Sequence, residues 1–513
     1  MVSKAFPIPS FAGLSTHIDP QWIATVLANT GTASVRRRKL PAEQVVWLVI
    51  ALALFRHQSM AQVVAELDLV LPDEVDASIA DSALTQARQR LGQEPLAQLF
   101  ALCAAGWDTR HQQGQSWRGL ACYAIDGSTL RTPDTAANRE HYGSQEYASG
   151  VLSSYPQMRL LTLTSLSSHL LRDAVFGEYN KNEMRYAADL LSSIPAHSLT
   201  VLDKGFVSAA LLLQIQNHGE QRHWLTAAKS NAKWTRLDEH PTDYHVQMRV
   251  SPQARKANPE LPEHWQARAI EVVSRQGKRR ILLTSLMDKK AWPAQEIAQQ
   301  YERRWHVELS YRELKQQLLG SESTLRSGHP QTIEQEVWGA LLAYNLVRLE
   351  MAEIAKESRL HPTELSFVAA MDYLQLEWIT LASCPSPGSL PALLQRMRIR
   401  LSERLLPKQR RGRTCPRVVK KVPSRYPVRQ VRKPEVNGIR ALGADLRDQL
   451  LHQISIRFDV ITTAIGFLFS TFVGISSEDP LGYLTSSELL IGTLLQKRVN
   501  ALCQVQCHES ASP

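Results

Sequence analysis

Two short apolar runs that each end in an aspartate constrain the fold of this chain more than any other feature. Residues 120–125 end at Asp126 and residues 199–202 end at Asp203, with a glycine close to each aspartate. Both runs have the length of a buried strand, and the glycines let a ligand approach the backbone closely. They predict an α/β domain in which two carboxylates stand at the ends of strands. A turn residue after a strand is the simpler explanation for either aspartate alone.

A third candidate carboxylate lies on a helix predicted over residues 293–319. Tyr301, Arg304, Glu308 and Lys315 follow one another at intervals of three, four and seven residues. At about 100° per residue the four side chains share an arc of about 60° on one helix face. An exposed ladder of ion pairs is the simpler explanation of these charges when the stretch is considered by itself. Whether these four residues form a site or a surface ladder therefore depends on the rest of the chain.

The basic charge of the chain is concentrated in one segment. The net charge of +10 indicates a polyanionic partner, and residues 407–434 contain eleven Lys or Arg and no Asp or Glu. Without this segment the chain has 48 basic and 49 acidic residues. Its five prolines exclude a continuous helix, so we expect an extended DNA-binding arm. The candidate contacts in it are Lys408, Arg410, Arg411 and Arg413.

Length indicates a protein of several domains, and cysteine usage indicates a reducing compartment. A chain of 513 residues with 44% hydrophobic composition can form several domains with sizeable cores. The six cysteines form no CxxC pair or disulfide framework, and no secretory signal is recognised, so we expect a cytoplasmic protein. Residues 45–55 are apolar but too few to cross a membrane, so a membrane partner is not expected.

The apolar periodicity changes along the chain and predicts its organisation. Residues 1–118 read as helical, 119–345 as a mixed α/β domain with a β-rich insertion at about 219–290, and 346–433 as further helices and the basic arm. The helix expected after Ser82 carries Gln86, Arg88 and Arg90 on its outer face, which suits entry into a DNA groove. A solvated face of a helical bundle explains this helix equally well.

Three carboxylates brought together by folding predict a metal site. Asp126, Asp203 and Glu308 would supply the hard oxygen ligands that suit Mg²⁺, or Mn²⁺. Two such ions would activate a water or a 3′-hydroxyl and stabilise the leaving oxygen of an in-line phosphoryl transfer. The neighbouring Arg304 and Lys315 would then hold phosphates, and Tyr301 could donate a hydrogen bond to one.

These motifs resemble those of one family of bacterial transposases. The spacing Tyr301-x2-Arg304-x3-Glu308-x6-Lys315 is similar to the YREK signature of the insertion-sequence-four family of DDE transposases. The segments AIDGSTLRTPD around Asp126 and LDKGF around residue 203 resemble the first and second aspartate motifs of that family. The resemblance covers about residues 15–433.

The resemblance implies a ribonuclease H-like catalytic core interrupted by a β-rich insertion. It also implies an enzyme of the bacterial nucleoid that binds the terminal inverted repeats of an insertion sequence as a homodimer, with no small-molecule substrate. The enzyme would cut double-stranded DNA and join the 3′ ends to target DNA. Asp126, Asp203 and Glu308 would hold the metal ions, while Tyr301, Arg304 and Lys315 would bind the terminal phosphates.

Two features depart from the family pattern. Relatives that cut through a DNA hairpin carry a tryptophan at the start of the strand before the glutamate helix, where this chain has Arg280. A cation there could stack on a flipped base less well, or bind phosphate instead. The tail 434–513 has no family likeness, and its apolar run 460–477 is expected to form a buried or poorly ordered helix.

Two other functions remain open from the residues alone. A catalytically silent DNA-binding protein would use only the N-terminal helices and the basic arm. A structure-selective nuclease would share the carboxylates but would never join a 3′ end to target DNA.

Overall fold

The computed structural model describes most of the chain up to residue 406. The described residues are 17–33, 40–69, 79–112, 115–147, 152–273, 277, 279–320, 324–383 and 390–406. The predicted arm 407–434, with Lys408, Arg410, Arg411 and Arg413, lies outside them, as do the tail and its apolar run. In the part of the chain that is described, no helix is long and apolar enough to cross a membrane.

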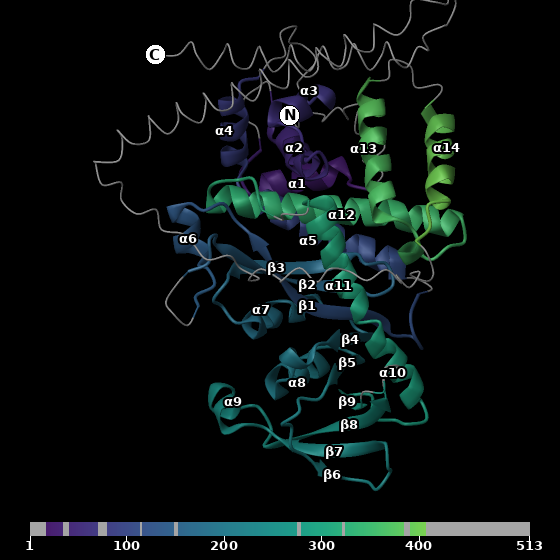
Figure 1. Cartoon of the computed structure of the whole chain (residues 1–513). Helices are drawn as coiled ribbons and strands as arrows, with labels where there is room; N and C mark the ends of the chain where they lie inside the picture. Colours follow the sequence, from purple (N-terminus) through teal and green to yellow (C-terminus); the bar gives the residue numbers. More distant parts are fainter. Residues whose placement is uncertain are drawn as a thin grey trace, which may run out of the picture. The chain divides into compact units, whose positions relative to one another are not determined.

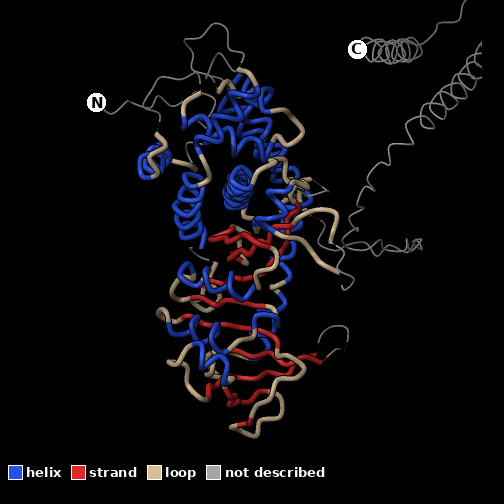
Figure 2. The backbone as a smooth tube through the Cα atoms, turned by 90° about the vertical axis from the view of Figure 1, so that its left-hand side faces the viewer, coloured by secondary structure: helices blue, strands red, loops and turns tan. Residues whose placement is uncertain are grey.

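Nine strands of the described chain form one mixed sheet in the order β3-β2-β1-β4-β5-β9-β8-β7-β6. The strands stack down the lower part of the molecule in Figure 2. The parallel centre is β1, β4 and β5, and the other pairings are antiparallel. The strand bounds are β1 Ala121–Arg131, β2 Gln157–Ser165, β3 Leu171–Glu178, β4 Ser198–Leu202, β5 Arg222–Ala227, β6 Thr235–Arg236, β7 Asp243–Arg249, β8 His264–Val273 and β9 Arg279–Thr284.

Helices precede, cover and follow this sheet (Figure 1). The N-terminal helices are α1 Pro20–Asn29, α2 Ala42–Leu54, α3 Met60–Glu66, α4 Asp81–Leu91 and α5 Glu94–Gln112. Those within the sheet region are α6 Ala136–Tyr142, α7 Glu183–Asp189, α8 Ala209–Asn217 and α9 Pro252–Ala257, with short 3₁₀ turns at Leu191–Ser193 and Lys204–Phe206. The last ones are α10 Ala294–Glu302, α11 Trp305–Arg312, the π-helix η5 Glu313–Leu318, α12 Pro330–Glu357, the 3₁₀ turn η6 Pro362–Glu364, α13 Phe367–Ser383 and α14 Leu390–Ser402. The predicted fold class, an α/β core with a β-rich insertion and flanking helical regions, is confirmed.

Local sequence signals account for where several of these helices begin. The side chain of Asp19 accepts a hydrogen bond from the backbone N–H of Gln21 at the start of α1, where Pro20 takes the first position. Ser59 and Gln62 form a reciprocal capping box at the start of α3. These start signals are explicit in the sequence, and both helices lie in the N-terminal region that was predicted to be helical.

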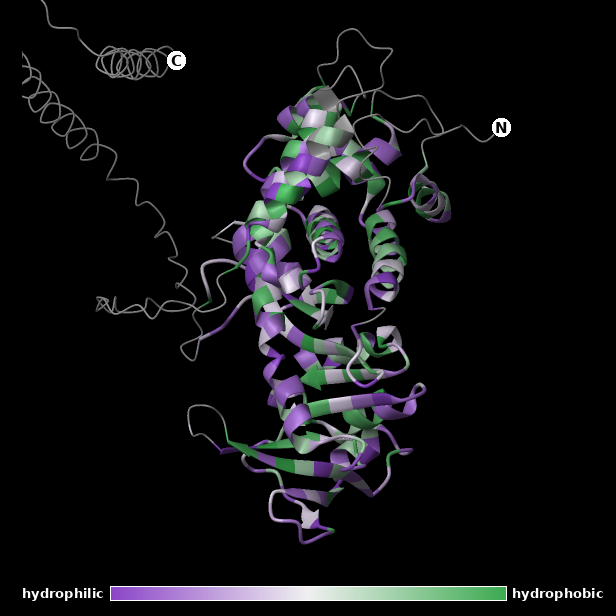
Figure 3. Ribbon diagram, turned by 90° about the vertical axis from the view of Figure 1, so that its right-hand side faces the viewer, coloured by the Kyte–Doolittle hydropathy of each residue, from purple (hydrophilic) through white to green (hydrophobic). Residues whose placement is uncertain are grey.

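Alternation along the strands gives the sheet two buried faces. On β1, Ala124 packs in the core that includes α5, α10, α11 and α12, while Ile125 packs in the core beneath α7 and α8. On β4, Val201 and Leu202 divide between the same two cores. Figure 3 shows hydrophobic and hydrophilic residues interspersed along the strands and helices, as expected for elements that are buried on only part of their surface.

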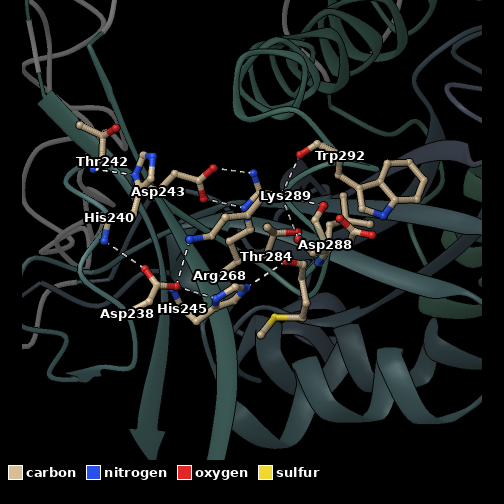
Figure 4. Close-up of polar contacts among 12 residues, drawn as sticks. Asp238, His240, Thr242, Asp243, His245, Arg268, Thr284, Asp288, Lys289 and Trp292 are labelled. Carbon is tan, nitrogen blue, oxygen red and sulfur yellow. Dashed lines mark hydrogen bonds and ion pairs between the residues drawn. The ribbon is translucent and has the colours of Figure 1, made fainter.

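The predicted insertion continues the central sheet. Its strands β6 to β9 extend the sheet from β5, and a fully buried Arg268 on β8 ties them to the connection that leads into α10 (Figure 4). Arg268 donates two hydrogen bonds of 2.7 Å to the carboxylate of Asp243 and another of 2.7 Å to the carbonyl of Trp292. Such a bidentate pair fixes direction as well as distance. The insertion therefore helps to set where α10 starts.

The prediction of one regular helix over 293–319 is wrong, because the stretch is divided into α10, α11 and η5. The chain tightens at Arg303 and Arg304, where His306 and Val307 donate backbone bonds to the carbonyls three residues earlier, and α10 ends before α11 begins. After α11 the backbone widens into η5, where Leu319 donates to the carbonyl five residues earlier. The angular positions of an ideal helix therefore do not apply across this stretch.

Gly339 lets α12 cross close to α2. A Cβ atom at this position would lie 2.7 Å from Cγ1 of Val49 and 2.8 Å from its carbonyl oxygen. We expect Gly339→Ala to lower the free energy of unfolding by about 1–3 kcal/mol, because backbone must move to admit the methyl group. Urea unfolding would measure this. Gly106→Ala on α5 is the control, since nothing lies within 4 Å of the added carbon. Equal stability of the two variants would contradict the prediction.

Candidate active site

Parallel pairing brings Asp126 and Asp203 to adjacent positions. Ile125 of β1 is in register with Leu202 of β4. Asp126 is the next residue of β1, and Asp203 follows the last residue of β4 and caps the 3₁₀ turn Lys204–Phe206. Neighbouring strands lie about 4.8 Å apart, so the two aspartates start from adjacent backbone positions. Asp126 continues the alternation that faces α11, because Ala124, two residues earlier, packs in the core on that side. The predicted meeting of the two aspartates agrees with this register.

Arg304 joins Asp126 to Glu308. Its guanidinium lies 2.9 Å from Oε1 of Glu308 and 3.7 Å from Oδ2 of Asp126. Figure 1 shows α11, which carries Glu308, beside β1. The ion pair with the residue four positions later is the one expected from the simple ladder, but the second pair reaches a strand far away in the sequence. An isolated surface ladder does not account for that second contact.

Asp126 has a raised pKa at this site. Burial raises the pKa of Asp126 to about 6, and the charges of Asp203 and Glu308 add to the shift. The N–H of Gly127, which donates a 2.8 Å bond to Asp126, and the guanidinium of Arg304 oppose it. The charges of both other carboxylates therefore act on Asp126. Such repulsion favours a bound cation.

Lys315 reaches the same face of β1 beyond Asp126. Its ammonium donates a 3.1 Å hydrogen bond to the hydroxyl of Ser128, and the hydroxyl of Tyr311 donates a 2.6 Å bond to the carbonyl of Asp126. The strand was expected to end at residue 125, but β1 runs on through Arg131. Sequence reasoning missed Ser128 for this reason, since period-two alternation places it on the face of Asp126 once the strand is extended.

Tyr301 is a core residue at the edge of the site. Its ring is 8% exposed, and burial raises the pKa of its hydroxyl, which Arg304 and Arg280 oppose. Arg280 is exposed at the start of β9. Its charge, like that of Arg304, acts on the hydroxyl of Tyr301. Trp224 is fully buried against Trp265, with ring centres 5.6 Å apart, and packs in the core.

The donor atoms suit a divalent cation. Among the described residues no three His, Cys, Asp or Glu side chains are gathered closely enough to hold a metal ion. The carboxylates of Asp126, Asp203 and Glu308 are nevertheless hard oxygen donors, and Arg304 pairs with two of them in this structure. The donor atoms present therefore fit the expected group in chemistry.

Arg88 and Arg90 lie in different surroundings on α4. Arg88 does not project from an outer face: its guanidinium donates a 2.9 Å bond to Gln335 and a 3.2 Å bond to Ser327. It therefore fastens α4 to α12 and its preceding segment. Arg90 and Gln86 are exposed, as predicted.

Comparison with known proteins gives consistent results along the chain. Residues 9–101 match the family described as insertion element 4 transposase N-terminal, and residues 117–346 match the transposase DDE domain. The chain is 39% identical over 418 residues to the transposase InsG for insertion sequence element IS4 of Escherichia coli (strain K12), covering 81% of this chain and 93% of the relative. It is 38% identical over 226 residues to the putative transposase InsZ of the same organism, covering 44% and 74%.

A solved piggyBac transposase synaptic complex with hairpin DNA is also similar, with a TM-score of 0.41, 10% identity and coverage of 76% of this chain and 85% of that chain. That similarity is too low to inform the argument. The sheet, its aspartates and the matched domain define a DDE transposase. More particularly, the chain belongs to the insertion element 4 family of transposases, as its motifs predicted.

Proposed function

We propose that this transposase cuts DNA at the terminal inverted repeats of its insertion sequence and joins the 3′ ends to target DNA. The observations that support it best are the register of Ile125 with Leu202, the residues just before Asp126 and Asp203, and the contacts of Arg304 with Asp126 and Glu308. Asp126, Asp203 and Glu308 are the proposed catalytic residues. They would hold Mg²⁺, or Mn²⁺, as two ions, which when bound activate the attacking oxygen and stabilise the leaving one.

The cations of the site have a separate task in this proposal. When DNA binds, Arg304 gives up an ion pair with a carboxylate and binds a DNA phosphate instead. Its planar guanidinium can donate to two phosphate oxygens. Lys315, already directed at Ser128 on β1, holds a second phosphate as a point charge. The hydroxyl of Tyr301 donates to a phosphate oxygen. Arg280 at the start of β9 adds positive charge where hairpin-forming relatives carry tryptophan.

The proposed partner is double-stranded DNA, bound by a homodimer. Arg90, exposed on α4, contacts DNA in this proposal, whereas Arg88 positions that helix. The basic arm 407–434 would track the phosphate backbone, so neutralising several of Lys408, Arg410, Arg411 and Arg413 weakens binding regardless of sequence.

A joining assay tests the function directly. The purified full-length chain is given a labelled DNA end that carries the element's terminal repeat with a free 3′-hydroxyl, together with a supercoiled plasmid and Mg²⁺. We expect the labelled end to become covalently attached to the plasmid, since a transferase uses the 3′-hydroxyl as nucleophile. A matched end with a 3′-dideoxy nucleotide is the control and should not be joined.

The same assay separates the alternatives. A structure-selective nuclease would nick the supplied DNA in Mg²⁺ or Mn²⁺ but leave no label on the plasmid. A silent DNA-binding protein would shift the terminal DNA in a gel and do neither. Either result would overturn the proposed function.

A further inference from the structure

A chain of buried polar side chains connects the two ends of α11. Arg348 of α12 forms an ion pair with Glu313, the first residue of η5, and the hydroxyl of Tyr344 donates a 3.1 Å bond to the same carboxylate. Another hydrogen bond of Arg348, 2.8 Å long, reaches Nδ1 of His169 in the turn between β2 and β3. His169 in turn lies 3.0 Å, through Nε2, from Nδ1 of His306 near the start of α11.

The bonds of this chain have a defined direction. The guanidinium of Arg348 can only donate, so Nδ1 of His169 accepts. Burial lowers the pKa of His169 to about 3, which leaves a neutral ring with its proton on Nε2. That proton is donated to His306. Reversing one of these bonds would leave two donors or two acceptors facing each other, so the arrangement admits one geometry.

The chain of bonds lies in the interior. The side chains of Arg348, Glu313 and His169 are 1%, 8% and 2% exposed. Charged groups are kept in such surroundings only when they are paired, and removing one partner leaves an uncompensated charge. None of these residues contacts Asp126 or Asp203 in the described structure, so the site already proposed does not explain them.

The backbone at His169 is held in a conformation that its residue type disfavours. Its φ is +63°, in the left-handed region that residues with a Cβ rarely occupy. Such conformations persist where the surrounding structure determines them. Here the ring is fixed from both sides, by Arg348 and His306. Close by, Asn345 of α12 exchanges two bonds of 2.9 and 2.8 Å with the backbone of Leu171, which anchors α12 on the start of β3.

The π-helix directs neighbouring residues to different partners. Glu313 at its start turns inward to Arg348, and Lys315 two residues later reaches Ser128 on β1. The widened turn of η5 makes room for both contacts. Glu308 therefore lies on a two-turn helix whose start is held through His306 and whose end is held through Glu313.

We propose that the ion pair of Glu313 with Arg348, continued through His169 to His306, is a positioning device that holds Glu308 against Asp126. It rests on the proposed function, in which Glu308 acts in the chemistry. These residues touch no substrate, so they act through α11. Catalytic groups displaced by about 1 Å can lose about 10²-fold in rate, so a helix fixed at both ends has a direct use.

The test replaces the ion pair by apolar side chains of similar length. Glu313→Met with Arg348→Met removes both charges together, which avoids a lone buried charge. The matched control is Glu350→Met with Arg398→Met, another pair between a buried carboxylate of α12 and an arginine, 2.8 Å apart, that does not contact α11. The measurements are the melting temperature, the affinity for terminal-repeat DNA, and the cleavage rate as a function of DNA concentration.

We expect the Glu313/Arg348 double variant to fold and to bind terminal DNA like the parent. Its cleavage rate at saturating DNA should fall by about 10- to 100-fold, while the DNA concentration for half-maximal rate stays unchanged. The control variant should cleave at the parental rate. The proposal is overturned if the double variant folds and cleaves normally, or if its slower rate is matched by equally weak DNA binding.

A second variant covers the possibility that the double variant does not fold. His169→Gly removes the ring that links Arg348 to His306 and relieves the left-handed backbone at the same time. We expect a folded protein with a reduced rate at saturating DNA. His169→Asn, which tolerates this backbone and keeps one polar contact, should recover part of the rate. A parental rate in His169→Gly would contradict the proposal.

Glu308→Gln assayed alongside distinguishes this proposal from the proposed function. If Glu308→Gln cleaves at the parental rate, the catalytic assignment fails. If Glu308→Gln is inactive and both network variants are fully active, the assignment stands and only the positioning device fails.

Discussion

Glu308→Gln should reduce the rate of DNA cleavage by about 10³-fold or more, while the affinity for terminal-repeat DNA stays within about two-fold of the parent. The amide keeps the length and shape of the side chain and can still accept a bond from Arg304, which lies 2.9 Å from the carboxylate. What it loses is the negative charge that would help to hold a divalent cation opposite Asp126. Chemistry should therefore suffer and DNA binding should not.

Two measurements on the same preparation check this prediction. Cleavage of an end-labelled terminal repeat in Mg²⁺ gives the rate, and a gel shift in the presence of EDTA gives the affinity. Glu302→Gln is the matched control, since Glu302 is an exposed carboxylate at the end of α10 and faces none of the proposed site. Normal cleavage by Glu308→Gln, or an equal loss in Glu302→Gln, would remove Glu308 from the catalytic set.

The strands that carry the aspartates were predictable because their signals are local. A buried strand reads as a continuous apolar run, and the residue after it is marked by a charge and a nearby glycine. The strand that precedes Asp203 was therefore found within one residue of its observed bounds. That the residues just before Asp126 and Asp203 are in register follows from parallel pairing, which the sequence does not specify directly.

The helix carrying Glu308 was harder to predict because its departures from regularity have tertiary causes. No proline or glycine interrupts residues 294–318, so local propensity favours one continuous helix. The turn at Arg303 is held by bonds from its guanidinium to Gln300 and to the carbonyl of Leu166, and the π-helix by Glu313 and its distant partner. Contacts between residues so far apart in the sequence leave no periodic pattern.

The family resemblance predicted which residues form the site but not their arrangement. It placed Arg304 among phosphate ligands, whereas the structure has its guanidinium at two carboxylates. It carried no information about Tyr311, which donates to the carbonyl of Asp126, or about Ser128, which lies on the same strand and accepts a bond from Lys315. The polar chain through Arg348 was invisible for the same reason, because its members are ordinary residues at unremarkable spacing and meet only in the folded protein.

Arg304→Gln tests whether Arg304 binds DNA or only neutralises its neighbours. We expect terminal-DNA affinity to fall by about 10-fold, and the slope of log affinity against log salt to decrease by about one unit, because one phosphate contact is lost. Cleavage at saturating DNA should slow as well, because the end of the DNA is no longer held at Asp126. Arg304→Lys should recover the salt slope but only part of the rate, since one ammonium cannot bind two oxygens as a guanidinium does.

A purely structural arginine would give a different set of results. If Arg304 served only its ion pairs with Asp126 and Glu308, Arg304→Gln would lower the melting temperature and leave the salt slope unchanged. Arg118→Gln provides that reference, because Arg118 is an exposed arginine paired with Glu296 on α10, 2.5 Å away, and belongs to no proposed site. An unchanged salt slope in both variants would mean that Arg304 only forms ion pairs with its neighbours. Lys315 and Arg280 would then have to bind the terminal phosphates.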